Sequence, residues 1–424
     1  MMRDVVTVVS SVLLLSGCVG GSSSVTVATD EVDEVTAVEE VVSNTPVASF
    51  VVVDAGQDNC YSTTGGAISC SSAPTGQDGD YVGPQPSYTD NGDETVTDNN
   101  TGLMWSAVTI NDVTFTDGDS VAAASSHAGY IDWRVPTIKE LYSLIDFSGS
   151  TGMSENDAVP YIDTGYFDME FFSTGTRYID AQYLTSTAYV GTVFDGQAAF
   201  FGVNFIDGRI KGYPQSGAWN LRLVRGSEAF ENSFADNGDN TITDSATGLQ
   251  WMQRDSSSFA GTAGSQGDGR VDWREALAWC EGVSDASRSD WRLPNAKELQ
   301  SIVDYSRAPD ISGTPAIDPL FEVVTMLDPD GNTNYPFYWS STTHLDGPIA
   351  GDHAIYVAFG EAQGRFNVVT QAIGVGEELL DVHGAGAQRS DPKSGNIGDY
   401  PDYFGPQGDV RYVYNYARCV RTPG

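Results

Sequence analysis

The feature that most constrains the fold of this chain is an internal duplication. An 18-residue block at 88–105 returns at 234–251, and eleven of its 18 positions are identical in the two copies. A second block, Asp-Trp-Arg-(Val/Leu)-Pro-x-x-Lys-Glu-Leu, occurs at 132–141 and again at 290–299. A period near 150 residues is much longer than that of any solenoid repeat, so the sequence indicates that a whole domain has been duplicated.

Each copy contains signals for both strands and helices. Asn-Gly-Asp followed by Thr-Val-Thr or Thr-Ile-Thr is typical of a hairpin turn and its second strand. Asp272 and Glu275 have the spacing of a capping box, and Pro294 stands where a second helix can begin. Short aromatic-rich strands follow in the second half of each copy. The sequence therefore predicts an α+β fold with two tandem domains, at 54–226 and 227–424.

The start of the chain predicts export and lipid attachment. Residues 1–17 have a weakly basic start and a short apolar run, which is too short to span a bilayer and is typical of a signal peptide. The run ends in Leu-Ser-Gly-Cys, which resembles the bacterial lipobox and makes Cys18 the lipid attachment site. An ordinary signal peptide with a chance cysteine is the alternative. Val19 in place of Asp favours an outer-membrane lipoprotein, facing either the periplasm or the cell surface.

Charge excludes several classes of partner. The chain has 58 acidic and 21 basic residues, a net charge of −37. Nucleic-acid-binding proteins concentrate Lys and Arg, so nucleic acid is not expected as a partner, and the membrane is expected to be contacted through the lipid anchor only. Residues 18–53 are acidic and polar and predict a flexible tether, with a single exposed strand as the alternative.

The five cysteines are interpreted as one lipid attachment site and two disulfides: Cys18, Cys60 with Cys70, and Cys280 with Cys419. An exported compartment permits oxidation. Cys280 and Cys419 align with Ala122 and Leu223 of the first copy, so both positions are cysteine in one copy and apolar in the other, as a contacting pair would be. Closing this loop of about 140 residues stabilises the fold by at most about 5 kcal/mol in the chain-entropy model.

The two repeated blocks resemble the Lcl C-terminal domain family, a family of unknown function related to the C-type-lectin-like fold. The resemblance covers nearly all of 54–424 in two copies. It implies two C-type-lectin-like domains, each with a hairpin, two helices, short antiparallel strands and long loops. It also implies surface recognition, in one adhesin of sulfated glycans. The net charge of −37 argues against a sulfated ligand here.

Six aspartates in the repeated hairpins are candidate ligands for calcium: Asp90, Asp93, Asp98, Asp236, Asp239 and Asp244. Carboxylates in a glycine-containing turn are the ligands that calcium prefers. The spacing does not fit an EF-hand, and Asp-Asn-Gly-Asp is also ordinary turn chemistry, which the sequence favours. Calcium is the one cofactor that we consider.

The second copy carries about 40 additional residues near 366–417, and we expect them to form a loop that holds the ligand-binding side chains. The candidates are His383, Gln388, Arg389 and Asp391. Long structured loops are often functional. The alternative is a self-packed loop in which Arg389 pairs with Asp391 or Asp381.

These observations favour a non-enzymatic binding or adhesion lipoprotein of the cell envelope, whose ligand is a glycan or a protein. Two alternatives stay open. An enzyme on a related fold would use the 381–393 segment, although no GxSxG or HExxH motif accompanies Ser390 or the histidines. A structural envelope component would have no dedicated ligand.

Overall fold

The computed structural model describes residues 50–169, 177–228, 230–259, 264–401 and 403–423. The predicted signal peptide 1–17, the lipid site Cys18 and the tether up to residue 49 lie outside the described residues. The last part of the expected tether, 50–53, packs on the globular fold, where Phe50 and Val53 are buried.

Each repeat opens with the predicted hairpin and ends on a strand that returns to it. In the first repeat Val224 pairs with Trp105, and in the second Val420 pairs with Trp251. Both tryptophans are fully buried. The two small sheets therefore have the same order, and each joins the start of its repeat to its end. Their strands are β3 (Tyr88–Asp90), β4 (Thr95–Asp98), β5 (Met104–Ser106) and β12 (Val224–Arg225), and β13 (Phe234–Asp236), β14 (Thr241–Asp244), β15 (Gln250–Met252) and β25 (Val420–Arg421).

The predicted helices are present in both repeats. Asp272 caps the first helix of the second repeat by accepting a hydrogen bond from the backbone N–H of Glu275. Thr137 and Asn295 cap the second helices in the same way, each in a capping box with the Glu three residues later. The described helices are α1 (Gly118–Ala124), α2 (Ile138–Ser143), α3 (Trp273–Gly282), α4 (Ala296–Ser301) and α5 (Pro309–Ser312).

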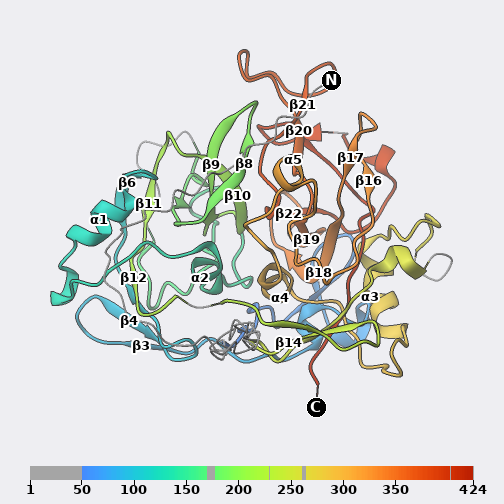
Figure 1. The fold of residues 1–424 in the computed structure, drawn as a ribbon, viewed down its shortest axis with the longest axis horizontal. Coiled ribbons are helices and arrows are strands. Elements are labelled where there is room, and N and C mark those ends of the chain that lie inside the picture. The colour runs from blue at the N-terminus through green and yellow to red at the C-terminus, as the bar shows by residue number, and fades with distance from the viewer. Residues whose placement is uncertain (1–49, 170–176, 229, 260–263, 402, 424) are drawn as a thin grey trace, which may run out of the picture. The chain divides into compact units, whose positions relative to one another are not determined.

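A nine-stranded sheet runs through both repeats. Its order is β18-β19-β22-β10-β9-β7-β11-β6, and β8 also pairs with β9. The junction is the antiparallel pairing of Ile210 in β10 with Gln388 in β22, and Figure 1 shows the green strands of the first repeat beside the orange strands of the second. The strands are β6 (Ile110–Thr114), β7 (Gln182–Tyr183), β8 (Ala188–Val193), β9 (Gln197–Asn204), β10 (Arg209–Pro214), β11 (Ala218–Leu221), β18 (Phe337–His344), β19 (His353–Ala358) and β22 (Gln388–Pro392).

The additional residues of the second repeat supply β22 and most of a separate four-stranded sheet. That sheet contains β20 (Gln363–Arg365), β21 (Leu379–Asp381), β23 (Tyr403–Phe404) and β24 (Asp409–Val410). Two-residue ladders are formed by β1 (Cys60–Tyr61) with β2 (Ala67–Ile68) and by β16 (Met326–Leu327) with β17 (Thr333–Asn334). The protein is thus an α+β fold with two tandem copies, in which strands outnumber helices.

Both predicted disulfides are present. Cys60 is bonded to Cys70, and Cys280 in α3 is bonded to Cys419 just before β25. In the first repeat the aligned Ala122 and Leu223 are buried in one hydrophobic cluster. The first repeat therefore joins its first helix to its last strand by apolar packing, where the second repeat uses a covalent bond.

Two buried arginines hold equivalent loops in the two repeats. Arg222 donates to the carbonyls of Ser106 and Ala107 at 2.7 and 2.6 Å, and Arg418 donates to those of Met252 and Gln253 at 2.9 and 2.6 Å. Each guanidinium also reaches a carbonyl from a more distant part of its repeat, Asp168 or Glu322. Both side chains are fully buried.

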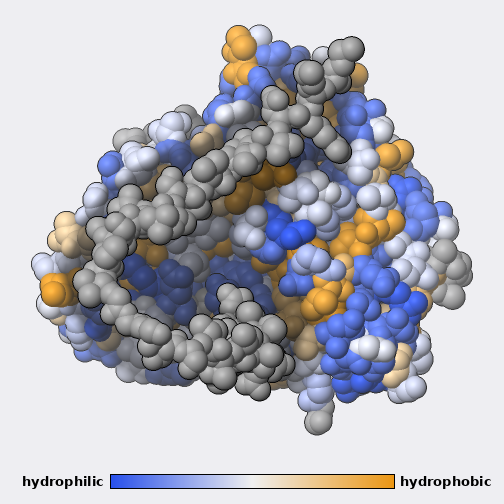
Figure 2. Space-filling model, viewed as in Figure 1, coloured by the Kyte–Doolittle hydropathy of each residue, from blue (hydrophilic) through white to orange (hydrophobic). Residues whose placement is uncertain are grey.

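Within the described residues, no helix is both long and apolar enough to cross a bilayer. The tip of the insertion is apolar and exposed, because Val369 and Val375 are 87% and 86% exposed. Orange atoms gather there at the top of Figure 2, above β20 and β21 in Figure 1.

Candidate functional site

Two equivalent helices meet at the junction of the repeats. Lys139 in α2 donates from Nζ to the carbonyl of Ser301, the last residue of α4, at 2.7 Å. Lys297 in α4 donates from Nζ to the carbonyl of Ser143, the last residue of α2, at 3.1 Å. The last carbonyls of a helix have no partner within the helix, so each lysine satisfies one on the other repeat. Burial lowers the pKa of both ammonium groups to about 8.

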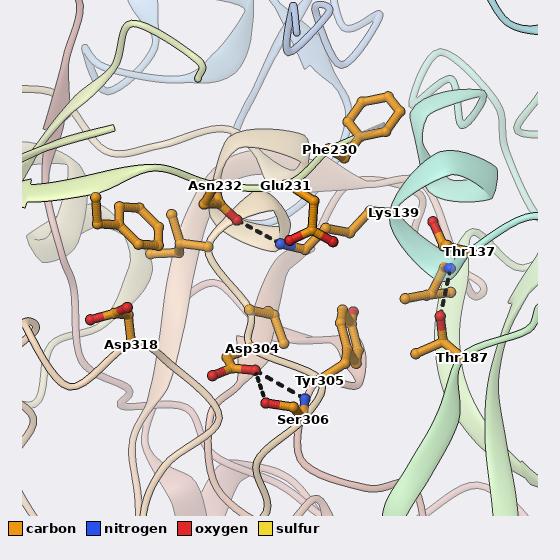
Figure 3. Close-up of a pocket in the computed structure, with 14 residues that line it drawn as sticks. Thr137, Lys139, Thr187, Phe230, Glu231, Asn232, Asp304, Tyr305, Ser306 and Asp318 are labelled. Carbon is orange, nitrogen blue, oxygen red and sulfur yellow. Dashed lines mark hydrogen bonds between the residues drawn. The ribbon is translucent and has the colours of Figure 1, made fainter. Parts of the chain in front are cut away.

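A cavity of about 410 Å³, which we call the junction pocket, opens beside Lys139. It is lined by the start of α2, the segment that connects the repeats, and the residues after α4 (Figure 3). Lys139 Nζ also donates to Asn232 Oδ1 at 2.7 Å, and Thr187 Oγ1 accepts from the backbone N–H of Ile138 at 3.0 Å. These bonds fix the polar wall of the pocket.

Three carboxylates and three aromatic rings line the rest of the junction pocket: Glu231, Asp304, Asp318, Phe230, Phe234 and Tyr305. Asp304 Oδ1 accepts from the backbone and the hydroxyl of Ser306, at 3.0 and 2.6 Å. Glu231 is exposed, and Figure 3 shows its carboxylate close to Lys139. Aromatic faces beside a few fixed hydrogen-bonding groups are typical of small-molecule sites.

At the corresponding place in the second repeat, residues from the start of the described chain contact the aligned threonine and its neighbour. Thr342, which aligns with Thr187, donates from its hydroxyl to Asp78 Oδ2 at 2.7 Å. The Gln57 side chain accepts from the backbone N–H of Thr343 at 2.8 Å and donates to its carbonyl at 2.9 Å. A separate cavity of about 510 Å³ lies beside these contacts in the second repeat, and its lining includes Asp78, Asn295 and Ser341.

The six aspartates proposed for calcium are engaged in the turns of their own hairpins. Asp90 and Asp236 each accept from the backbone N–H of the glycine two residues later, at 2.8 Å. Asp93 and Asp239 accept from threonine hydroxyls at 2.6 and 2.5 Å. Asp98 and Asp244 are buried and accept from Asn100 N–H and Ala246 N–H, respectively.

Among the described residues, the acidic and sulfur groups that lie close enough for a metal are Cys60, Cys70 and Asp80, and the two sulfurs are bonded to each other. The aspartates thus show the turn chemistry that the sequence favours, and the calcium site stays a prediction.

The insertion residues are buried in the sheet, and the expectation of a loop over 381–393 is wrong in this respect. Gln388, Arg389 and Asp391 belong to β22, which has β19 on one side and β10 on the other. All three and His383 are buried, with at most 3% of any one exposed. All five residues of β22 are buried, so neither face of the strand is open to solvent. A ligand-binding role for these four side chains stays a prediction, and only His383 lines a described cavity.

The charges of this segment are paired within the protein. Arg389 pairs with Asp409, in place of the expected Asp391 or Asp381. His383 Nε2 lies 2.7 Å from Asp409 Oδ1, and burial together with Arg389 lowers the pKa of His383 to about 3. Burial raises the pKa of Asp391 and of Asp381 to about 7.

Comparison with known proteins identifies the family. The sequence profile of the Lcl C-terminal domain matches residues 94–225 and 240–373, which together are more than half of the chain. The chain belongs to the Lcl C-terminal domain family. No curated protein and no solved structure matches it. The two matched Lcl C-terminal domains include α2, α4 and the paired lysines, whereas β21 to β24 lie beyond the second match.

Ser390, in the insertion beyond the second matched domain, has a histidine partner other than His383. Its Oγ lies 2.7 Å from His344 Nδ1, and His344 Nε2 lies 2.9 Å from the carbonyl of Asp207. Burial lowers the pKa of His344 to about 3, so the ring is neutral: Nε2–H donates to the carbonyl and Nδ1 accepts the serine proton. Both side chains are buried, and the pair links β18, β22 and the turn before β10.

Sequence reasoning missed the two lysines at the junction of the Lcl C-terminal domains. The signal was available, because Lys139 and Lys297 occupy the same position in the repeated Lys-Glu-Leu segment. A charged residue that is identical in two copies of an amphipathic helix is a reason to look for a shared partner.

Proposed function

We propose that the protein is an exported binding lipoprotein of the cell envelope, attached through Cys18 to the outer membrane, whose two Lcl C-terminal domains have a C-type-lectin-like architecture and recognise a neutral glycan without catalysing a reaction. The lipobox-like Leu-Ser-Gly-Cys and the two disulfides support export. The disulfide that joins α3 to the last strand of the second domain supports the lectin-like architecture.

The observation that carries the proposal is the junction pocket. The carboxylates of Glu231 and Asp318 can accept hydrogen bonds from sugar hydroxyls, and the rings of Phe230, Phe234 and Tyr305 offer faces for sugar C–H groups. The same carboxylates, in a chain of net charge −37, repel sulfated or phosphorylated glycans. A neutral glycan is therefore the ligand class that the lining favours, with a protein partner as the second class.

A glycan array probed with residues 50–424 tests this proposal. The lining variants are Glu231→Gln and Asp318→Asn, and the matched control is Asp119→Asn, an exposed aspartate on α1. We expect neutral glycans to bind the wild type and the control and to bind the lining variants at least tenfold more weakly. Equal binding by all forms would place the ligand elsewhere. Absence of any glycan or protein ligand would favour the structural envelope role.

The anchor is tested separately by mass spectrometry of the mature N-terminus in a bacterial host. We expect a lipid-modified Cys18, and a Cys18→Ser form that is released from the membrane fraction. An unmodified Cys18 would contradict the lipid anchor and would favour an ordinary signal peptide.

A further inference from the structure

The cavity of about 510 Å³ in the second repeat, which we call the acidic pocket, is lined by two distant parts of the chain. Residues between 50 and 54 and between 78 and 84 form one part of its wall. The second repeat forms the rest, including Leu249, Arg292 and the start of α4. The acidic pocket shares no lining residue with the junction pocket.

Four carboxylates line the acidic pocket, and Asp78 differs from the other three. Both oxygens of Asp54, Asp290 and Glu298 accept hydrogen bonds from backbone N–H groups or from arginines. Asp78 Oδ2 accepts a hydrogen bond from the Thr342 hydroxyl at 2.7 Å. Asp78 Oδ1 accepts none from the described residues, although the residue is only 3% exposed, and this oxygen is open to the cavity.

The Thr342 hydroxyl fixes the carboxyl of Asp78 at the wall of the acidic pocket. Thr342 Oγ1 accepts from the backbone N–H of Ala296 at 2.9 Å, so its own proton is directed to Asp78. A buried carboxylate with one unpartnered oxygen costs free energy, which a donor in the cavity would offset. The geometry therefore leaves one hydrogen-bonding position for a ligand.

The charge of the acidic pocket favours a cation at this position. Arg292 is the only basic side chain among the described lining residues, and Glu298 binds its guanidinium through both oxygens. Burial, together with the charges of Asp54 and Glu298, raises the pKa of Asp78 to about 7, against the effects of Thr342 and Arg292. A positive group beside the carboxyl stabilises its ionised form.

The rest of the lining favours an organic cation over a metal ion. Among the described residues, no three of the carboxylates lie close enough to share a metal. Aliphatic side chains also line the cavity, those of Val51, Val82, Pro84 and Leu249, and Val82 is 88% exposed. One available carboxylate oxygen beside aliphatic side chains suits an ammonium group that carries a hydrocarbon chain.

We propose that the acidic pocket binds a small aliphatic amine, whose ammonium group donates a hydrogen bond to Asp78 Oδ1 and whose hydrocarbon chain packs against Val82 and Leu249. The proposal does not depend on the glycan proposed for the junction pocket, because the two cavities are separate.

Isothermal titration of residues 19–424 with 1,4-diaminobutane, at a salt concentration of about 0.15 M, tests the proposal. The uncharged counterpart, 1,4-butanediol, has the same chain length but no ammonium group. We expect the diamine to bind with a Kd of about 1 mM or tighter, and the diol at least tenfold more weakly. The Kd of the diamine should fall about tenfold between pH 6 and pH 8, because Asp78 loses its proton over this range whereas the diamine stays protonated.

Asp78→Asn keeps the shape of the side chain but cannot ionise. We expect this variant to bind the diamine at least tenfold more weakly at pH 8, with an affinity that no longer depends on pH. Asp119→Asn, an exposed position on α1, is the control and keeps full affinity. The pH series and the diol comparison use the wild type, so they test the proposal even if the variant does not fold.

Four results would overturn the proposal: no binding of the diamine, equal binding of diamine and diol, a wild-type affinity that is constant from pH 6 to pH 8, or equal affinity in wild type and folded Asp78→Asn. Glycan binding at the junction pocket would be unaffected by any of them.

Discussion

Lys139 and Lys297 exchange equivalent hydrogen bonds across the two repeats, each from its ammonium group to the last helical carbonyl of the other repeat. This is the arrangement of a twofold-symmetric dimer interface, in which the same patch is used by both partners, built here within one chain. The duplication is thus visible in the sequence and in the way that the two copies contact each other.

The first prediction concerns the pH dependence that these lysines confer. The folded-state pKa of Lys297 is lowered to about 8, so between pH 8 and the ordinary lysine pKa near 10.5 the unfolded chain binds more protons than the folded one. The free energy of unfolding of the wild type should therefore rise relative to Lys297→Met as the pH is raised from 8 to 10. Urea denaturation of both proteins at several pH values measures it. A constant difference would show that the lysine titrates normally in the fold.

The second prediction is that the two repeats unfold together. They share a nine-stranded sheet through Ile210 and Gln388 and a hydrophobic cluster that contains residues of both. Scanning calorimetry of residues 50–424 should show one transition whose calorimetric and van't Hoff enthalpies agree. Two separable transitions would mean that the shared sheet does not couple the repeats.

The third prediction transfers the long disulfide to the first repeat. Ala122 and Leu223 align with Cys280 and Cys419 and are buried in one cluster. The double variant Ala122→Cys, Leu223→Cys should form a disulfide under oxidising conditions, seen as a two-dalton loss in the mass of the non-reduced protein. Ala122→Cys alone is the control for misplaced pairing. Two free thiols in the oxidised double variant would show that the repeats differ in geometry at this position.

The fourth prediction concerns the buried arginines. Arg418→Met removes the partner of three carbonyls, those of Met252, Gln253 and Glu322, and should lower the free energy of unfolding by at least about 3 kcal/mol. Arg421→Met breaks a pair with the exposed Asp290 and one hydrogen bond to Gln250 Oε1 at 2.7 Å, and should cost about 1–2 kcal/mol. Chemical denaturation compares the two. Similar losses would remove the distinction between a guanidinium that holds three carbonyls and one that pairs with an exposed carboxylate.

The fifth prediction uses the buried carboxyl of Asp78, which accepts a hydrogen bond from Thr342 in the second repeat. Burial raises the pKa of Asp78 to about 7, above its unfolded value near 3.8. Its protonation therefore stabilises the fold fully below pH 3.8, and this contribution is lost as the pH rises through 7. Thermal melts should show the wild type losing stability relative to Asp78→Asn between pH 5 and 8. Parallel melting curves across that range would contradict the raised pKa.

The sequence predicts what lies within a repeat. The hairpin turns, the capping boxes of Asp272 and Asn295 and the pairing of Cys280 with Cys419 follow from local spacing and from comparison of the copies, and the structure contains them. Each of these features depends on residues that are close in the chain or on a comparison of aligned positions in the two copies. A single sequence is therefore sufficient to predict them.

The sequence does not predict how the repeats join. The segment that forms β22 predicts a polar loop, because Arg389, Ser390 and Asp391 follow one another with no apolar side chain between them. Their burial depends on Asp409, His344 and Arg411, which are distant in sequence and compensate the charges. Pairing of β22 with β10 of the other repeat has no local signal. The same holds for the junction pocket, whose walls come from three separate segments.

The position of β22 also has a consequence for aggregation. Because β22 lies between β19 and β10, removing the insertion would divide the nine-stranded sheet and leave two strands with unpaired N–H and C=O groups along one side. Such open edges are templates for pairing with other molecules. A protein shortened in this way would therefore be prone to self-association, and β22 protects the duplicated fold from it.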